Sequence, residues 1–457
     1  MEVLSGPSSE TRAQLRRMLM LAIPVIFAEL GWMSMSVVDT IMVGPLGPAA
    51  IGAAGVGSSA FYTFAIFGMG LLLGLDTLVA QAFGAGDRAA CHRLLTQGVY
   101  LALFITPVLM GIFVMMPPFF YTFGVNPQVS ALAGPFVLVL SWGTLPLLLY
   151  GAQRRYLQAM GHVRPVMFVL VSANVVNWFF NWILIEGHWG LPALGVRGSA
   201  LSTCIARVYM AVLLAVFIWW FERREPDLSS LFRKPDFPRI MRLLRIGFPA
   251  ALQILLEIGA FGSAAVLAGR LAPVSLAAHQ IALNCAAITF MAPLGISSAA
   301  AIAVGQSIGR GEPRIARSSG YIGLGLACVF MTCSALAFLS APMKILRVYT
   351  SDPGVLGIGT GLLGLAGIFQ LFDGIQTVAT GALRGLGDTR APMLVNLAGY
   401  WFFGLPLGYV LCFHYGYGVY GLWCGLTAAL IAIASILLFF WNRTSRAIAC
   451  TSKLSGY

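Results

Sequence analysis

Long apolar stretches separated by short polar segments follow one another along nearly the whole chain. Because a helix needs about 20 apolar residues to cross a bilayer, the pattern predicts twelve spans. Prolines interrupt the fourth span (Pro135, Pro146) and the eighth (Pro293), where neighbouring helices can satisfy the freed backbone groups. The predicted spans are residues 19–43, 54–82, 94–116, 131–151, 165–186, 196–221, 246–268, 280–305, 318–340, 358–380, 392–413 and 418–441.

The two halves of the chain resemble each other. VAQAFGAGD at 79–87 matches VGQSIGRGE at 304–312 with an offset of 225, and IP at 23–24 matches FP at 248–249 with the same offset. Six spans per half is an even number, so both halves enter the membrane in the same direction. Two further pairs keep the same order along the chain, LQAMGHVRP at 157–165 with LRGLGDTRAP at 383–392 and GVRG at 195–198 with GVYG at 418–421.

This repeat predicts an all-α membrane protein with two six-helix lobes related by a parallel pseudo-two-fold axis. Residues 1–221 would form the first lobe, and residues 246–457, with a short cytoplasmic tail, the second. A polar stretch with seven Lys and Arg residues, 222–245, would be the linker. In transporters built from such repeats the substrate cavity lies between the halves, and access alternates as the halves rock.

Composition agrees with a protein that lives in a lipid bilayer. The chain is 59% hydrophobic and 10% charged, whereas soluble domains carry about 25% charged residues. The net charge of +12 could indicate binding to nucleic acid, but 23 Lys and Arg lie in the N-terminus, the even-numbered loops and the C-terminus, against 4 in the odd-numbered loops or, for Arg197, at the edge of one. Lys and Arg collect in cytoplasmic loops, so we expect both termini in the cytoplasm and no nucleic-acid partner.

Three carboxylates stand isolated inside apolar spans: Asp39 in the first, Glu257 in the seventh and Asp373 in the tenth. An ionised group in hydrocarbon is costly, so such residues face a bundle interior or an aqueous cavity and mark ion or substrate paths. We therefore expect cation coupling at these positions, by Na⁺ or H⁺. Glu29 and Asp76 also lie in apolar runs, where a structural role and a functional role both remain open.

Several amides share helix faces inside the spans. Asn174, Asn177 and Asn181 are spaced i, i+3, i+7, and Gln280 and Asn284 are spaced i, i+4. Amides at such positions line polar cavities or join helices by hydrogen bonds. Both interpretations stay open at this point.

Other motifs give little support to enzymatic chemistry. GLGD at 385–388 matches the GxGD of intramembrane aspartyl proteases, but it sits in a short predicted loop without a YD partner. The chain has no Walker lysine motif and its eight cysteines show no metal-ligand spacing, so we expect neither ATP drive nor a cofactor. The GxxxG from Gly70 to Gly74 indicates close helix packing.

Taken together, these residues resemble the MATE (multidrug and toxic compound extrusion) family, in its NorM-like branch. The similarity covers both halves. The fifth span carries only Asn where the DinF-like branch has Asp, which favours the NorM-like branch. The matching segments are VVDTIMVG at 37–44, the stretch from Pro249 to Glu257, AAHQIALN at 277–284 and FQLFDGIQTVATGALRGLGDT at 369–389.

The resemblance implies a cation-coupled antiporter, with Na⁺ or H⁺ as coupling ion and no cofactor, that exports hydrophobic, often cationic drugs across a bacterial inner membrane. Glu257 and Asp373 would form the cation site of the second lobe, binding a metal ion only if that ion is Na⁺, and Asp39 would be the acidic site of the first. Gln280, Asn284 and Phe369 would line the cavity. We expect a monomer.

An alternative is a flippase for lipid-linked saccharides from the same wider superfamily. Such a protein would need a cavity rich in Arg or Lys to hold pyrophosphate. Arg207 is the only basic residue that the pattern places clearly inside a span. The sequence therefore favours the antiporter over the flippase.

Overall fold

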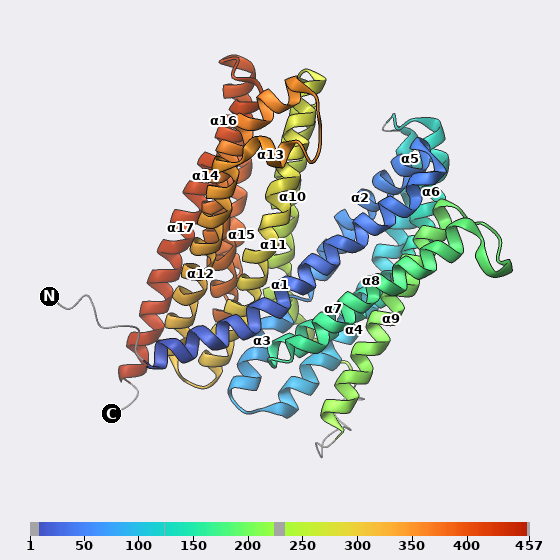
Figure 1. The fold of residues 1–457 in the computed structure, drawn as a ribbon. Helices are drawn as coiled ribbons and strands as arrows, with labels where there is room; N and C mark the ends of the chain where they lie inside the picture. Colours follow the sequence, from blue (N-terminus) through green and yellow to red (C-terminus); the bar gives the residue numbers. More distant parts are fainter. Residues whose placement is uncertain (1–8, 123, 224–233, 455–457) are drawn as a thin grey trace. The chain divides into compact units, whose positions relative to one another are not determined.

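The chain folds as a multi-pass, all-helical membrane protein (Figure 1). The computed structural model describes residues 9–122, 124–223 and 234–454, and no strand occurs within these ranges. The helices are α1 (Ser9–Val43), α2 (Pro48–Leu71), α3 (Gly74–Gly84), α4 (Arg88–Met115), α5 (Pro117–Thr122), α6 (Pro127–Ser141), α7 (Thr144–Ala159), α8 (Val163–Glu186), α9 (Val196–Glu222), α10 (Phe237–Ala268), α11 (Pro273–Gly309), α12 (Pro313–Ser340), α13 (Pro342–Leu346), α14 (Pro353–Leu386), α15 (Arg390–Asn396), α16 (Leu405–Tyr409) and α17 (Gly418–Leu454).

The predicted number of spans is confirmed. Among the described residues, eleven helical stretches are long and apolar enough to cross a membrane, and the bent pair α6 and α7 makes a twelfth. This pair bends by 50° at Trp142 and Gly143, just before Pro146, which has no N–H to donate to the preceding turn. The predicted interruption at Pro293 is wrong, because α11 runs unbroken through that residue and neighbouring helices enclose it.

The described chain divides into two compact units. Unit 2 holds residues 27–251 and unit 1 holds residues 1–26 and 252–457. They differ from the predicted lobes because the first part of α1 groups with unit 1 and the first part of α10 with unit 2. Residues 224–233 of the predicted linker lie outside the described ranges.

Both divisions fall inside a long helix and at equivalent points of the repeat. Ile26 and Ala251, the last residues before the divisions, are 225 positions apart. Pro24 and Pro249 precede them by two residues and lie within α1 and α10. Each half of the sequence therefore starts its first helix in one unit and finishes it in the other.

The repeat is also visible in its turns. Gly86 and Gly311 take positive φ angles of 77° and 73°, a conformation that glycine adopts without steric cost. Asp87 N donates to Ala82 O at 3.0 Å, and Glu312 N donates to Ser307 O at 2.9 Å. The matching Gly-Asp and Gly-Glu positions of the two halves thus end their helices in the same way.

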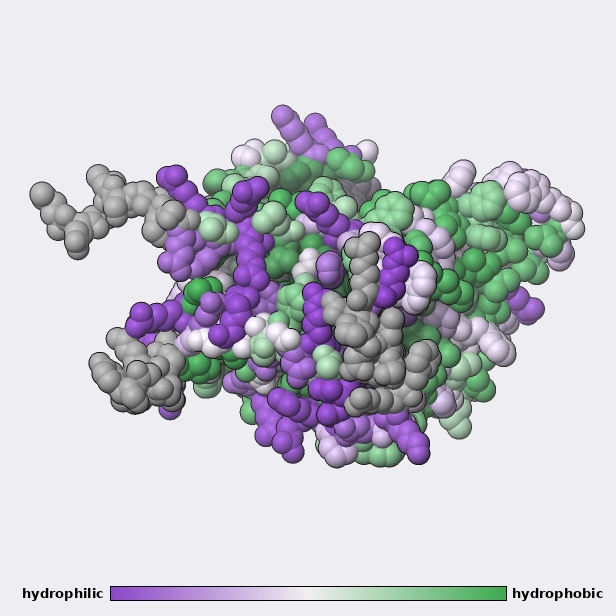
Figure 2. All heavy atoms as spheres, turned by 90° about the horizontal axis from the view of Figure 1, so that it is seen from below, coloured by the Kyte–Doolittle hydropathy of each residue, from purple (hydrophilic) through white to green (hydrophobic). Residues whose placement is uncertain are grey.

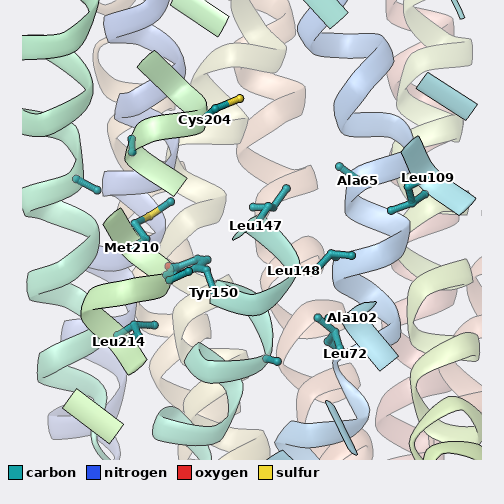
Figure 3. Packing of buried hydrophobic residues seen from close by; sticks show 14 of the residues in the cluster. Ala65, Leu72, Ala102, Leu109, Leu147, Leu148, Tyr150, Cys204, Met210 and Leu214 are labelled. Carbon is teal, nitrogen blue, oxygen red and sulfur yellow. The ribbon is translucent and has the colours of Figure 1, made fainter. Parts of the chain in front are cut away.

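The core of unit 2 is built around α7. Figure 3 shows Leu147, Leu148 and Tyr150 of α7 among buried residues of α2, α4 and α9. All three are at most 1% exposed. On the outside of the protein, hydrophilic side chains gather at the helix ends seen in Figure 2, while apolar side chains cover the flanks. That distribution is what a bilayer requires of a spanning protein.

Close helix packing at Gly70 and Gly74 gives a first prediction. A Cβ on Gly74 would lie 2.5 Å from Leu243 O, and one on Gly70 would lie 2.6 Å from Ala251 Cα, both in α10. Because backbone cannot yield cheaply, we expect Gly74→Ala to cost about 1–3 kcal/mol and to lower the melting temperature of the purified protein. Gly55→Ala is the matched control, since no atom lies within 4 Å of its Cβ position; equal melting of the two variants would contradict the packing role.

Candidate functional sites

Unit 1 brings together the two carboxylates predicted from the sequence. Glu257 lies on α10 and Asp373 on α14, close enough for their charges to act on each other. Asp373 is buried, and its Oδ1 has no hydrogen-bond partner among the described residues. None of the ion pairs formed within the described ranges includes either residue. Two neighbouring acidic groups without a basic partner form a site suited to a cation or a proton.

A phenol and an amide accompany this pair. Tyr400 is fully buried on a π-helical stretch, Leu397–Gly404, and its hydroxyl donates to Gln376 Oε1 at 2.9 Å. Gln376 is three residues after Asp373, so both project from neighbouring positions on α14. π-helical turns often occur at functional sites. Both residues were missed in the sequence analysis. Tyr400 lies in an apolar aromatic run, and Gln376 lies between Asp373 at i−3 and Thr380 at i+4 in a stretch where only the carboxylate stood out.

Phe369 belongs to an aromatic cluster beside the pair. Its ring, 2% exposed, lies 5.9 Å from the Phe261 ring and 5.5 Å from the Trp423 ring. Trp423 Nε1 donates to His279 Nδ1 at 3.0 Å. In the structure Phe369 is thus packed within unit 1, and cavity lining by this residue stays a prediction.

Gln280 and Asn284 lie on an exposed face of α11. Asn284 Nδ2 donates to Gln280 O at 3.0 Å, so one hydrogen bond of this amide goes to the backbone of its own helix. The two side chains share one face, as their spacing predicted, but no contact of theirs reaches the Glu257 and Asp373 pair among the described residues.

Unit 2 surrounds Asp39 with neutral hydrogen-bond donors. Asn177 Nδ2 and Asn181 Nδ2 donate to Oδ1 at 3.0 and 2.7 Å, and Thr203 Oγ1 donates to Oδ2 at 3.0 Å. Asn181 is fully buried, and its Oδ1 has no partner among the described residues. Carboxylate, amide and hydroxyl oxygens are hard ligands that suit alkali and alkaline-earth cations. Thr203 was missed because a hydroxyl in an apolar helix commonly bonds its own backbone, as this one also does to Ser199 O.

Asn174 behaves differently from the other two asparagines. Its Nδ2 donates to Gly31 O and to Leu170 O, both at 2.9 Å. Asn174 therefore joins α8 to α1 through the backbone, whereas Asn181, two turns further on, reaches Asp39. Gly31 contacts Asn174, and the later residue Asp39 contacts the later residue Asn181. The two helices α1 and α8 therefore run in the same direction, as a first and a fifth span must.

Glu29 and Asp76 are paired with arginines of α7. Arg154 Nη2 bonds Glu29 Oε1, and Arg155 Nη1 lies 3.2 Å from Asp76 Oδ2. Counting Arg207 as the only basic residue inside a span was therefore wrong, because α7 continues to Ala159 and carries both arginines. Each is neutralised by a carboxylate, so they provide no free cationic surface. Asp388 of GLGD accepts from Ala391 N at 3.1 Å, which ties it to the start of α15.

The Glu29 and Arg154 pair yields a second prediction. Both residues are buried, so Arg154→Gln leaves an unpaired carboxylate whose cost is about 3–5 kcal/mol. We expect that variant to lose most of its monodisperse peak in detergent size-exclusion chromatography. Glu29→Gln/Arg154→Gln should recover much of it, and Arg310→Gln, which breaks the exposed pair with Glu312, should change little. No recovery in the double variant would contradict a charge-pair role.

Both halves of the chain match one protein family. The MatE family profile matches residues 24–183 and 249–410, and the two matches start 225 positions apart, at the offset of the repeat. A eukaryotic MATE transporter, AtDTX14, has the same fold, with a TM-score of 0.85 and 21% identity over 97% of this chain and 99% of its own.

Curated bacterial relatives are more similar in sequence. The multidrug resistance protein NorM of Burkholderia vietnamiensis is 37% identical over 441 residues, 94% of each chain. A probable multidrug resistance protein NorM of Agrobacterium fabrum is 33% identical over 443 residues, 95% of each chain. With a profile match in both halves and this identity along nearly the full length, the chain belongs to the MatE family.

Proposed function

We propose that this protein is a multidrug efflux transporter that exchanges hydrophobic, often cationic compounds for Na⁺ or H⁺. The observation that carries the proposal is the pair of Glu257, which is partly buried, and Asp373, which is buried, with no basic partner among the described residues. Intramembrane carboxylates of this kind serve as ion or proton sites. The names of the NorM relatives support multidrug compounds as the substrate class.

The mechanism we propose is competition between cation and drug across two states of the transporter. A cation held by Glu257 and Asp373 favours one state, and drug binding favours the other. A ligand shifts such an equilibrium only through its different affinities for the two states. The carboxylate pair supplies that difference, because its charge is compensated only while a cation is bound. Asp39 with its amide and hydroxyl partners is a second candidate cation site, in unit 2.

We propose a bacterial plasma membrane location with both termini in the cytoplasm. Even without Arg154 and Arg155, most Lys and Arg remain at the termini and in the even-numbered loops, as the positive-inside rule requires. Transport rather than enzymatic chemistry is expected.

Expression in a bacterial host that lacks its own efflux pumps tests this function. The protein should raise several-fold the concentrations of ethidium and of a fluoroquinolone that stop growth, and Asp373→Asn at equal membrane abundance should not. If the wild-type protein leaves both concentrations unchanged while present in the membrane, drug export is contradicted. Labelled lipid-linked saccharide would then be the next substrate to assay.

A further inference from the structure

Arg207 is a buried positive charge without a carboxylate partner in direct contact. Its side chain is 1% exposed on α9, and no ion pair within the described ranges includes it. Two other arginines of unit 2, the buried Arg154 and the partly buried Arg155, each contact an acidic group. An arginine buried inside a spanning bundle is costly, so its charge must be compensated in another way.

The surroundings of Arg207 compensate it only partly. The guanidinium lies over the Phe61 ring, 4.6 Å from its centroid, and donates to Tyr62 OH at 3.3 Å and to Leu140 O at 3.5 Å. Leu140 is near the end of α6, where carbonyl groups carry partial negative charge, and its oxygen also accepts from Gly143 N at 3.0 Å. Aromatic faces and carbonyl dipoles attract a cation, but they do not supply a full negative charge.

A candidate for that charge is Asp39. Thr203, which donates to Asp39 Oδ2 at 3.0 Å, is four residues before Arg207 on α9, so the two residues lie about one helical turn apart on the same face. Arg207 is close enough to act on Asp39 electrostatically. Among the described residues, the donors to Asp39 are all neutral, namely the amides of Asn177 and Asn181 and the hydroxyl of Thr203.

We propose that Arg207 is the fixed counter-charge of Asp39 and determines how strongly the Asp39 cluster attracts a cation. The guanidinium, one helical turn from Thr203, supplies part of the positive charge that a bound cation would otherwise supply to Asp39. The Glu257 and Asp373 pair of unit 1 has no such group. The two acidic sites therefore differ in built-in charge, and the Asp39 cluster binds a cation more weakly than its oxygen ligands alone would allow.

Gly143 leaves room for the guanidinium because it has no side chain. A Cβ on Gly143 would lie 2.9 Å from Arg207 Nη1 and 2.9 Å from Cys204 Sγ. Gly143 is also in the break between α6 and α7. The break in the fourth span thus provides both the room and the carbonyl groups that hold the arginine beside the cluster.

A double-mutant cycle on the melting temperature of the purified protein in detergent tests the proposal. Asp39→Asn and Arg207→Gln each leave one charge uncompensated, and we expect each to lower the melting temperature. The double variant should melt about 3 °C or more above the value that adding the two single effects gives. Arg155→Gln with Asp39→Asn is the control cycle and should be additive, because Arg155 is paired with Asp76.

A second reading of the same samples separates charge from packing. Added Na⁺ should stabilise Arg207→Gln at about tenfold lower concentration than wild type, and Asp39→Asn in that background should abolish the gain. Arg207→Lys keeps the charge and should respond to Na⁺ like wild type. The proposal rests on the proposed function in treating Asp39 as a cation ligand. Neither the double-mutant cycle nor the Na⁺ dependence of melting requires transport, so a failure to export drugs would leave both results unchanged. Additive effects in the cycle, or a Lys variant that behaves like the Gln variant, would overturn it.

Discussion

Asp373→Asn will lower the initial rate of cation-driven efflux by about 100-fold or more. The change removes one of two neighbouring acidic groups, and a cation in a medium of low dielectric loses several kcal/mol of attraction when a charge a few ångströms away disappears. An amide of the same shape keeps the packing, so the protein should reach the membrane in normal amounts. The initial rate of ethidium efflux from loaded cells, normalised to membrane abundance, measures the effect.

Glu312→Gln is the control for this prediction. Glu312 is an exposed carboxylate of unit 1 at the turn before α12, where it pairs with Arg310. Its neutralisation should leave efflux unchanged, and Glu257→Gln should reproduce the loss seen with Asp373→Asn. Wild-type rates in either Asp373→Asn or Glu257→Gln would exclude that pair as the coupling site.

Asp39→Asn will also lower efflux, by about tenfold or more. The new amide would place an N–H₂ group against donors that now point at Asp39 Oδ1 and Oδ2, and a buried donor left unsatisfied costs about 1–3 kcal/mol. The cluster also loses its only charged oxygen ligand. The concentration of Na⁺ or H⁺ that gives half-maximal efflux should rise together with the loss of rate.

Asn174→Ala tests whether all three asparagines of α8 act with Asp39 or only the two that contact it. Asn174 bonds backbone carbonyls of Gly31 and Leu170 and does not contact Asp39. We expect the alanine variant to lose some stability and to keep wild-type cation dependence. An equal shift in cation dependence for Asn174→Ala and Asp39→Asn would mean that the amide face acts as one unit, contrary to the geometry.

The architecture could be predicted because membranes allow few solutions. A spanning segment must be long, apolar and helical, so the twelve spans and the repeat were readable from apolar runs and from turns such as those at Gly86 and Gly311. The three candidate carboxylates, Asp39, Glu257 and Asp373, could be singled out for the same reason, since a charged residue stands out in an apolar run. Arg154 and Arg155 were misplaced because a polar helix end looks like a loop when only hydropathy is considered.

The partners of the carboxylates could not be predicted in the same way. Asn174, Asn177 and Asn181 share one helix face, and only the axial position of α8 against α1 decides which of them reaches Asp39. Tyr400 lies in a run of aromatic residues whose hydropathy does not mark it as polar. The exchange of helix segments at Ile26 and Ala251 is a property of tertiary packing, which no local pattern in α1 or α10 encodes.

Transport in inside-out membrane vesicles tests the central claim most directly. Ethidium uptake is followed after an H⁺ gradient is imposed, and again after a Na⁺ gradient is imposed, for wild type, Asp373→Asn and Glu312→Gln. The proposal predicts that one of the two gradients drives uptake in wild type and Glu312→Gln, and that neither does so in Asp373→Asn. Uptake that is equal with and without a gradient, or that persists in Asp373→Asn, would contradict cation coupling at Glu257 and Asp373.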